Sequence, residues 1–303
     1  MTLQQLRQVL TIAESNSMNE AAKKLFVSQP NLSATVREVE EELGITVFMR
    51  NNRGITVTAE GEEFLGYAKQ VVEQYHLLEN RYLNVESKKK FSVSMQHYSF
   101  AVKAFVQLAK EVGMDEYEFA VHETKTKEVI DNVKNLKSEI GVLYLSDFNE
   151  KVLRKLFKEC DIEFKELFTC NTYVYLWKKH PLAGQKEITL DDLQEYPCLT
   201  FEQGVNNSFY YAEEMMSTYE YKRVIKADDR ATMLNLMVGL NGFTLCSGII
   251  SEDLNGDDYA AIPLKESEIM HIGYIKHKGT KLSKLGEIYI DALKNLSLIH
   301  ISE

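Results

Sequence analysis

Hydrophobic positions in residues 1–44 repeat at helical spacing in three separate segments. The first predicted helix spans residues 2–15, and Thr2 and Gln5 stand at capping-box spacing at its start. A second capping box, Ser17 with Glu20, begins a short helix that ends near residue 26. The apolar positions of these two helices are Leu3, Leu6, Val9, Leu10, Ala13, Ala21, Ala22 and Leu25.

The third segment predicts a longer helix followed by a hairpin. Ser28 is a good N-cap, Pro30 is tolerated in the first turn, and Gly44 ends an apolar stripe of Leu32, Val36, Val39 and Leu43. Two short apolar runs, 47–48 and 55–57, then flank a turn-rich stretch that predicts a two-stranded wing. Helix-turn-helix with a wing places the later helix in the DNA major groove, although periodicity alone also fits a plain three-helix bundle.

The sequence motifs in residues 21–61 favour the DNA-binding interpretation. It contains AA-x-x-L from residue 21, SQP-x-LS from residue 28, E-x-E-LG from residue 40, R-x5-T from residue 50 and T-x-x-G from residue 58. With these motifs at these separations, the sequence resembles the LysR-type transcriptional regulators. The resemblance continues more weakly through residues 180–183, 190–193 and 238–243, and the total length also matches.

The resemblance implies an α/β multidomain protein. Residues 1–58 form a winged helix-turn-helix, 59–90 a dimerisation helix and hinge, and 91–303 a two-lobed effector domain like a periplasmic binding protein. Lobe I comprises about 91–168 and 269–303, and lobe II about 169–268. The implied partners are double-stranded DNA with a dyad operator, a small-molecule effector, further copies of the chain as a dimer and tetramer, and RNA polymerase. No cofactor is implied.

A heptad pattern runs along the long helix predicted from residue 59 to residue 87. Spacings alternate between four and three, which is typical of a coiled-coil seam, and the seam residues are Phe64, Ala68, Val71, Tyr75, Leu78, Tyr82 and Val85. We expect the seam to pair with a second copy, which the resemblance implies to be antiparallel. The alternative is a helix that packs on its own domain. The lysines at 88–90 then mark a polar hinge.

Strand-like and helix-like segments alternate after residue 90. Strands are expected at 91–95, 119–122 and 140–145, with helices at 99–112 and 127–136, and this order predicts a parallel sheet flanked by helices. A strand over 170–177 is expected to lead into the second lobe, with elements at 190–193, 198–201, 208–218, 232–238 and 243–249. A return strand at 269–275 and a helix at 284–296 complete the unit.

The start of the third helix carries the candidate DNA-reading residues. Gln29 can bond a base bidentately, Asn31 and Ser33 offer smaller polar groups, and Pro30 offers apolar contact. Thr35 and Arg37 are expected at phosphates, and Arg50 and Arg53 of the wing at the backbone or minor groove. Simpler roles remain open: Ser28 as a cap alone, and Arg37 as the partner of Glu40 or Glu41.

The net charge of −10, taken over the whole chain, argues against a protein that binds DNA non-specifically. The distribution of the charge along the chain changes this interpretation. Residues 1–60 carry six basic and seven acidic side chains, residues 61–90 carry five of each, and the remainder holds the acidity. A nearly neutral head with few basic contacts predicts weak binding by one head and useful affinity only from linked heads.

The candidate effector residues follow strands that meet at one edge of the lobes. In lobe I they are Gln96, His97, Tyr98, Ser99, Thr124 and Thr126, and in lobe II they are Phe201 and Gln203. Backbone N–H groups at helix starts favour an anion, whereas Glu202 leaves room for an amino acid whose ammonium it could pair. Two simpler roles stay open: Thr126 as an N-cap alone, and the nearby aromatics as core residues.

Other chemistry finds little support in the sequence. No apolar run is long enough for a membrane helix and no signal peptide begins the chain, so we expect a cytoplasmic protein. His97 lacks partners at metal-ligand spacing, which predicts no metal and no catalytic residue, and no hydrolase, P-loop or HExxH motif is present. The remaining alternatives are a solute-binding receptor, an enzyme using the cleft, and a regulator that senses oxidants through Cys160 and Cys170.

Overall fold

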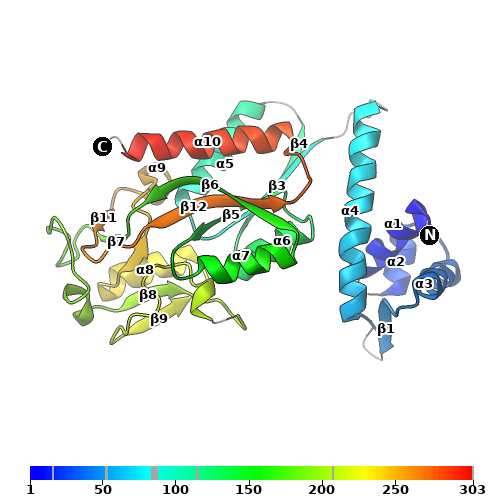
Figure 1. Ribbon diagram of the computed structural model, residues 1–303, viewed down its shortest axis with the longest axis horizontal. Helices are drawn as coiled ribbons and strands as arrows, with labels where there is room; N and C mark the ends of the chain where they lie inside the picture. Colours follow the sequence, from blue (N-terminus) through cyan, green and yellow to red (C-terminus); the bar gives the residue numbers. More distant parts are fainter. Residues whose placement is uncertain (16, 52–53, 83–87, 114–115, 207, 302–303) are drawn as a thin grey trace. The chain divides into compact units, whose positions relative to one another are not determined.

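The computed structural model describes residues 1–301, except residues 16, 52–53, 83–87, 114–115 and 207 (Figure 1). The chain divides into two compact units, Met1–Ser87 and Lys88–Glu303, which are treated separately below.

Three capped helices form the body of the first unit: α1 (Leu3–Ala13), α2 (Met18–Lys24) and α3 (Gln29–Leu43). The predicted capping box of Thr2 and Gln5 is confirmed, and the Ser28 side chain accepts a hydrogen bond from the Asn31 backbone N–H at 3.3 Å. Gly44 ends α3 in the left-handed conformation, with φ of 69°. The buried side chains of the three helices make one core, which includes Val9, Ile12, Ala21, Leu32, Val36 and Val39.

The wing consists of β1 (Phe48–Asn51) and β2 (Gly54–Val57), which pair antiparallel. Glu40 Oε1 accepts hydrogen bonds from the backbone N–H groups of Val47 at 2.7 Å and Phe48 at 3.0 Å. These bonds tie the entry of the wing to the last turns of α3. A Cβ on Gly61 would clash with the Val47 carbonyl oxygen, so the glycine of the T-x-x-G motif lets the following helix approach the wing.

The following helix, α4 (Ala59–Tyr82), uses part of the predicted seam inside its own unit. Ala68 is 2% exposed and packs with Val72 against Leu6 of α1, contrary to the expectation that it faces a second copy. Phe64 is also partly buried there. The exposed part of the seam is Val71, Tyr75 and Leu78; the side chain of Tyr82 and residue 85 lie outside the described residues.

Lobe I of the second unit is built on a five-stranded sheet in the order β4-β3-β5-β12-β6. Its strands are β3 (Lys89–Met95), β4 (Tyr117–Glu123), β5 (Ile140–Leu145), β6 (Ile162–Cys170) and β12 (Met270–His277). The parallel pairing predicted for the strands of residues 91–145 is confirmed, because β3 runs parallel to both β4 and β5. The return strand β12 runs antiparallel to both β5 and β6, which makes the sheet mixed. Neither β6 nor α7 (Glu150–Glu159) was predicted from the sequence.

Helices cover both faces of this sheet (Figure 1). One face is covered by α5 (Ser99–Val112) and α10 (Lys284–Ile301), which contact each other, with Tyr289 fully buried between them and the strands. The other face is covered by α6 (Thr126–Lys134) and α7. The carboxyl ends of β3 and β4 therefore lead directly into the N-termini of α5 and α6, where the candidate effector residues lie.

Lobe II contains two small sheets. One has the order β10-β7-β11, formed by β10 (Thr244–Cys246), β7 (Tyr173–Trp177) and β11 (Tyr259–Pro263); the other pairs β8 (Cys198–Phe201) with β9 (Val224–Ala227) in parallel. Its helices are α8 (Arg230–Leu240), the single turn α9 (Glu252–Asn255) and two 3-10 turns, η1 (Asp192–Glu195) and η2 (Phe209–Tyr211).

Two expectations for this lobe need correction. The strand predicted over 170–177 is interrupted between Cys170 and Tyr173, so β6 ends in lobe I and β7 begins in lobe II. The segment 208–218 holds only the short turn η2, because its buried residues include the charged pair Glu213 and Glu214 and not a continuous apolar stripe. Among the described residues, no helix is long and apolar enough to cross a membrane.

Candidate functional site

The N-terminal turn of α3 presents the predicted DNA-reading residues at the surface. Ser28, Pro30 and Asn31 are exposed, and Gln29 is half-buried. Gln29 Nε2 donates a hydrogen bond to Ser33 Oγ at 3.0 Å, which holds the amide beside the next turn of the helix. Farther along the helix, Thr35 is half-buried and Arg37 is exposed. Arg53 lies outside the described residues, and for Arg50 the structure describes only the backbone in β1.

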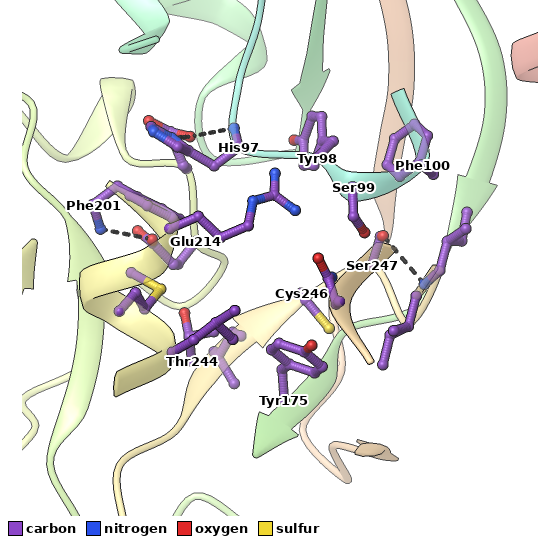
Figure 2. A pocket seen from close by; sticks show the side chains of 18 of the residues that line it. His97, Tyr98, Ser99, Phe100, Tyr175, Phe201, Glu214, Thr244, Cys246 and Ser247 are labelled. Atoms are coloured by element: carbon purple, nitrogen blue, oxygen red, sulfur yellow. Dashed lines mark hydrogen bonds and ion pairs between the residues drawn. The ribbon is translucent and has the colours of Figure 1, made fainter. Parts of the chain in front are cut away.

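A cavity lies between the lobes of the second unit (Figure 2). It has a volume of about 80 Å³, enough for several water molecules or the core of a small ligand. Lobe I contributes the loop after β3, the start of α5 and the first residue of β12, and lobe II contributes β7, α8 and the segment around β10. The predicted effector residues that line it are His97, Tyr98, Ser99 and Phe201.

Two buried hydroxyl groups stand in the wall of the cavity. Among the described residues Thr244 Oγ1 has no hydrogen-bond partner, whereas the Tyr175 hydroxyl interacts with the Asn255 side chain. Burial also raises the pKa of Tyr175, so this hydroxyl remains a donor. Because buried polar groups are almost always paired, the Thr244 hydroxyl is available to a polar molecule in the cavity.

Glu213 joins the two lobes at the edge of the cavity. Its carboxylate accepts hydrogen bonds from the His97 backbone N–H at 2.9 Å and from Gln203 Nε2 at 2.8 Å, and it lies 2.7 Å from His97 Nδ1. The His97 ring also stacks on Phe201, with ring centroids 3.6 Å apart. Dashed lines in Figure 2 mark the hydrogen bond from the His97 backbone N–H to the Glu213 carboxylate and the bond from the Phe201 backbone N–H to Glu214. The lobes are thus connected by polar and stacking contacts.

The N-terminus of α6 is occupied by a side chain of lobe II. Gln203 Oε1 accepts a hydrogen bond from the Thr126 backbone N–H at 3.1 Å, which is where an anion was expected. Thr126 Oγ1 donates to the Tyr211 carbonyl and accepts from Gln96 Nε2 at 2.6 Å. In this arrangement Gln96, Thr126 and Gln203 hold the lobes together. Thr124 is separate from them, since its hydroxyl donates to Glu128.

The charged residues that line the cavity, Glu213, Glu214 and Arg230, all come from lobe II. None of them was predicted from the sequence as an effector-binding residue. Glu214 is 5% exposed, and burial together with the nearby Glu213 charge raises its pKa to about 8. Arg230, at the start of α8, is bound to Glu123 of lobe I by two hydrogen bonds of 3.2 and 2.8 Å. No short motif marks these residues, because they are brought together only by the packing of the lobes.

The four cysteines, Cys160, Cys170, Cys198 and Cys246, are all free thiols and are buried or half-buried. Burial raises the pKa of all four cysteines, to about 12 for Cys170 and Cys246, and only the thiolate reacts readily with oxidants. The raised pKa values lower the fraction of reactive thiolate at neutral pH. Among the residues that the structure describes, no group of three potential metal ligands is found.

Comparison with known proteins gives matches over both units. The model of the bacterial regulatory helix-turn-helix protein, lysR family, matches residues 3–62, and the LysR substrate binding domain matches residues 115–297. The HTH-type transcriptional regulator CysL of Bacillus subtilis is 24% identical over 96% of each chain. The transcriptional dual regulator GltC of the same organism is 30% identical over 67% of this chain and 66% of its own.

Solved structures share the fold. A full-length OxyR variant from Pseudomonas aeruginosa aligns with a TM-score of 0.71 at 19% identity, covering 97% of this chain and 95% of its own. CbnR, a LysR family transcriptional regulator, aligns with a TM-score of 0.58 at 17% identity, covering 98% of this chain and 99% of its own. With family models matched over most of its length, the chain belongs to the LysR family of DNA-binding transcriptional regulators, with an N-terminal helix-turn-helix and an effector-binding domain.

Proposed function

We propose that this regulator binds a dyad operator as a dimer and that an amino-acid-like metabolite, bound in the cavity between the lobes, controls it. The observation that carries the proposal is the cavity wall, which holds both the carboxyl of Glu214 and the buried Thr244 hydroxyl, for which the described residues provide no partner. The wall thus offers both hydrogen-bonding and acidic groups to a ligand.

The charges around the cavity favour a ligand that carries an amino group. Glu213 and Glu214 both line it, whereas Arg230 is already neutralised by Glu123. An ammonium group beside Glu214 would compensate the burial and the Glu213 repulsion, which together raise the pKa of this carboxyl. A simple anion would instead add negative charge next to two buried acids, so we favour the amino-acid-like ligand over a purely anionic one.

The N-terminus of α5 is suited to the carboxylate of such a ligand. Among the described residues no side chain caps α5, and Ser99, in its first turn, lines the cavity. The positive end of the helix dipole and the Ser99 hydroxyl both favour a carboxylate there. Ligand binding at this place contacts both lobes, and it can alter the placement of the DNA-binding heads only if it prefers one arrangement of the lobes over another.

A thermal-shift screen of the full chain tests the proposal. The probes are the standard amino acids, each beside its 2-oxo acid, which lacks the amine, and its decarboxylated amine. We expect at least one amino acid to raise the melting temperature while both analogues of it fail, because binding to the folded state stabilises it by mass action. Glu214→Gln should abolish the shift, whereas the exposed Glu220→Gln serves as a matched control. Stabilisation by 2-oxo acids alone would contradict the proposal.

A further inference from the structure

The turn between α2 and α3 holds a large aromatic residue in a strained conformation. Phe26 has a φ of 55°, in the left-handed region that bulky side chains rarely adopt. The Phe26 N–H donates to the Lys23 carbonyl and the Val27 N–H donates to the Ala22 carbonyl, which are the two bonds of a Schellman motif. Phe26 therefore occupies the position after the helix cap, where glycine is strongly preferred.

Packing within the unit does not compensate this strain. Leu25 and Val27, on either side, pack against the core of the first unit, whereas Phe26 is 96% exposed. A left-handed conformation is unfavourable for a residue other than glycine, because its Cβ comes too close to the following carbonyl oxygen. Exposure of an aromatic ring to water adds no stability. Glycine or asparagine would form the same turn at lower cost, so folding of the unit does not explain the phenylalanine.

The position of Phe26 connects it to the surface that reads DNA. Phe26 stands two positions before Ser28, the N-cap of α3, so the two Cα atoms lie within about 7 Å. Pro30 and Asn31, in the first turn of α3, are exposed on the same end of the helix. Lys23, in the last turn of α2, is exposed beside the turn and carries the positive charge that phosphates require, whereas the neighbouring Lys24 pairs with Glu20 at 2.9 Å.

We propose that Phe26 is a DNA-contacting residue, which makes apolar contact with sugar and base atoms of the duplex beside the N-terminal turn of α3. The inference rests on the proposed DNA-binding role of α3 and extends it to a residue outside the helix. An aromatic side chain gains binding free energy by covering the apolar parts of a nucleotide, and it contributes no charge.

The test uses the full chain and a duplex that it selects from random-sequence DNA. Phe26→Gly and Phe26→Asn both suit the left-handed turn, and the matched control is Val205→Asn, an equally exposed apolar residue in the second unit. We expect both Phe26 variants to melt at or above the wild-type temperature and to bind the selected duplex about tenfold more weakly. Phe26→Trp should bind close to the wild type. Since phenylalanine displaces no counterions, the slope of log K against log salt should stay unchanged.

The possible outcomes separate the two proposals. Unchanged affinity of both Phe26 variants would overturn the contact, as would a fall in melting temperature that matches the loss of binding, because the residue would then be structural. A change in the mass of the Phe26 variants in solution would assign the ring to self-association and also overturn the contact. If the wild-type chain selects no sequence, the proposed operator recognition itself has failed.

Discussion

His97 Nδ1 lies 2.7 Å from Glu213 Oε2, and this contact between the lobes is buried, with side-chain exposures of 6% and 3%. A second pair, His271 and Glu166, has the same distance between the same atom types but lies at the surface, with exposures of 35% and 50%. The chain therefore contains its own control for the effect of burial on such a pair.

We predict that Glu213→Ala lowers the free energy of unfolding of the effector-binding unit by about 3 kcal/mol, because removal of one member leaves buried donors unpaired. Glu166→Ala should cost less than about 1 kcal/mol, since water replaces the lost partner. Urea denaturation of both variants at pH 7 measures the difference. Equal losses in the two variants would show that the contact between the lobes is no stronger than a surface pair.

The buried carboxyl of Glu214 predicts a specific dependence of stability on pH. Its pKa is raised to about 8 in the folded chain, from an ordinary value of 4.5. The folded state therefore retains a proton that the unfolded state releases. The contribution of Glu214 to the free energy of unfolding is present below about pH 5 and is lost as the pH rises to about 8. Glu214→Gln, which stays neutral, should be more stable than the wild type at pH 8.5 by about 2–4 kcal/mol and similar to it below pH 5.

Unfolding at pH 5.0, 7.0 and 8.5 checks this prediction, because the difference between the two proteins isolates the contribution of one group. Parallel stability curves would contradict the raised pKa. In the wild type, binding of an amine beside Glu214 should also release a proton at pH 7, since the ammonium lowers the pKa of the carboxyl. Calorimetric titration in two buffers with different ionisation enthalpies measures that release.

The first unit could be predicted from sequence to a greater extent than the effector cavity, because its determinants are local. Thr2, Ser28 and Gly44 act on neighbouring backbone groups, so capping rules place the helix ends. Glu213, Glu214 and Thr244 acquire their roles only from residues far away in the chain, such as His97. The spacing of residues within one segment cannot predict such contacts between residues that are far apart in the chain.

The long helix α4 shows a different limit of the sequence pattern. A heptad repeat predicts that an apolar stripe is buried against another surface. It does not predict whether that surface belongs to the same chain or to a second copy. Ala68 lies on the predicted seam, yet it is covered by Leu6 of the same chain. Val71 and Leu78 are more than half exposed, with 51% and 56% of their surface accessible. The part of the stripe left for a second copy therefore lies farther along the helix.

We predict that Val71→Glu and Leu78→Glu together convert a dimer to a monomer, because burying these charges in an apolar interface is unfavourable. Sedimentation velocity of the full chain should show the mass halved while the helical circular dichroism is retained. Ala68→Glu serves as the contrast: it should lower the melting temperature of the first unit itself, since the new side chain would have to displace α1. An unchanged mass in the double variant would refute the seam.

The final prediction separates base reading from phosphate contact on α3. Gln29→Ala should weaken binding to the selected duplex about tenfold and leave binding to bulk DNA unchanged, since a bidentate amide contact reads one base. Arg37→Ala should weaken both kinds of binding in similar proportion and lower the slope of log K against log salt by about one, because a single phosphate contact is lost. Fluorescence anisotropy at three salt concentrations measures both effects. If Gln29→Ala weakened both kinds of binding equally, the Gln29 amide would serve only to position Ser33, to which it donates its hydrogen bond.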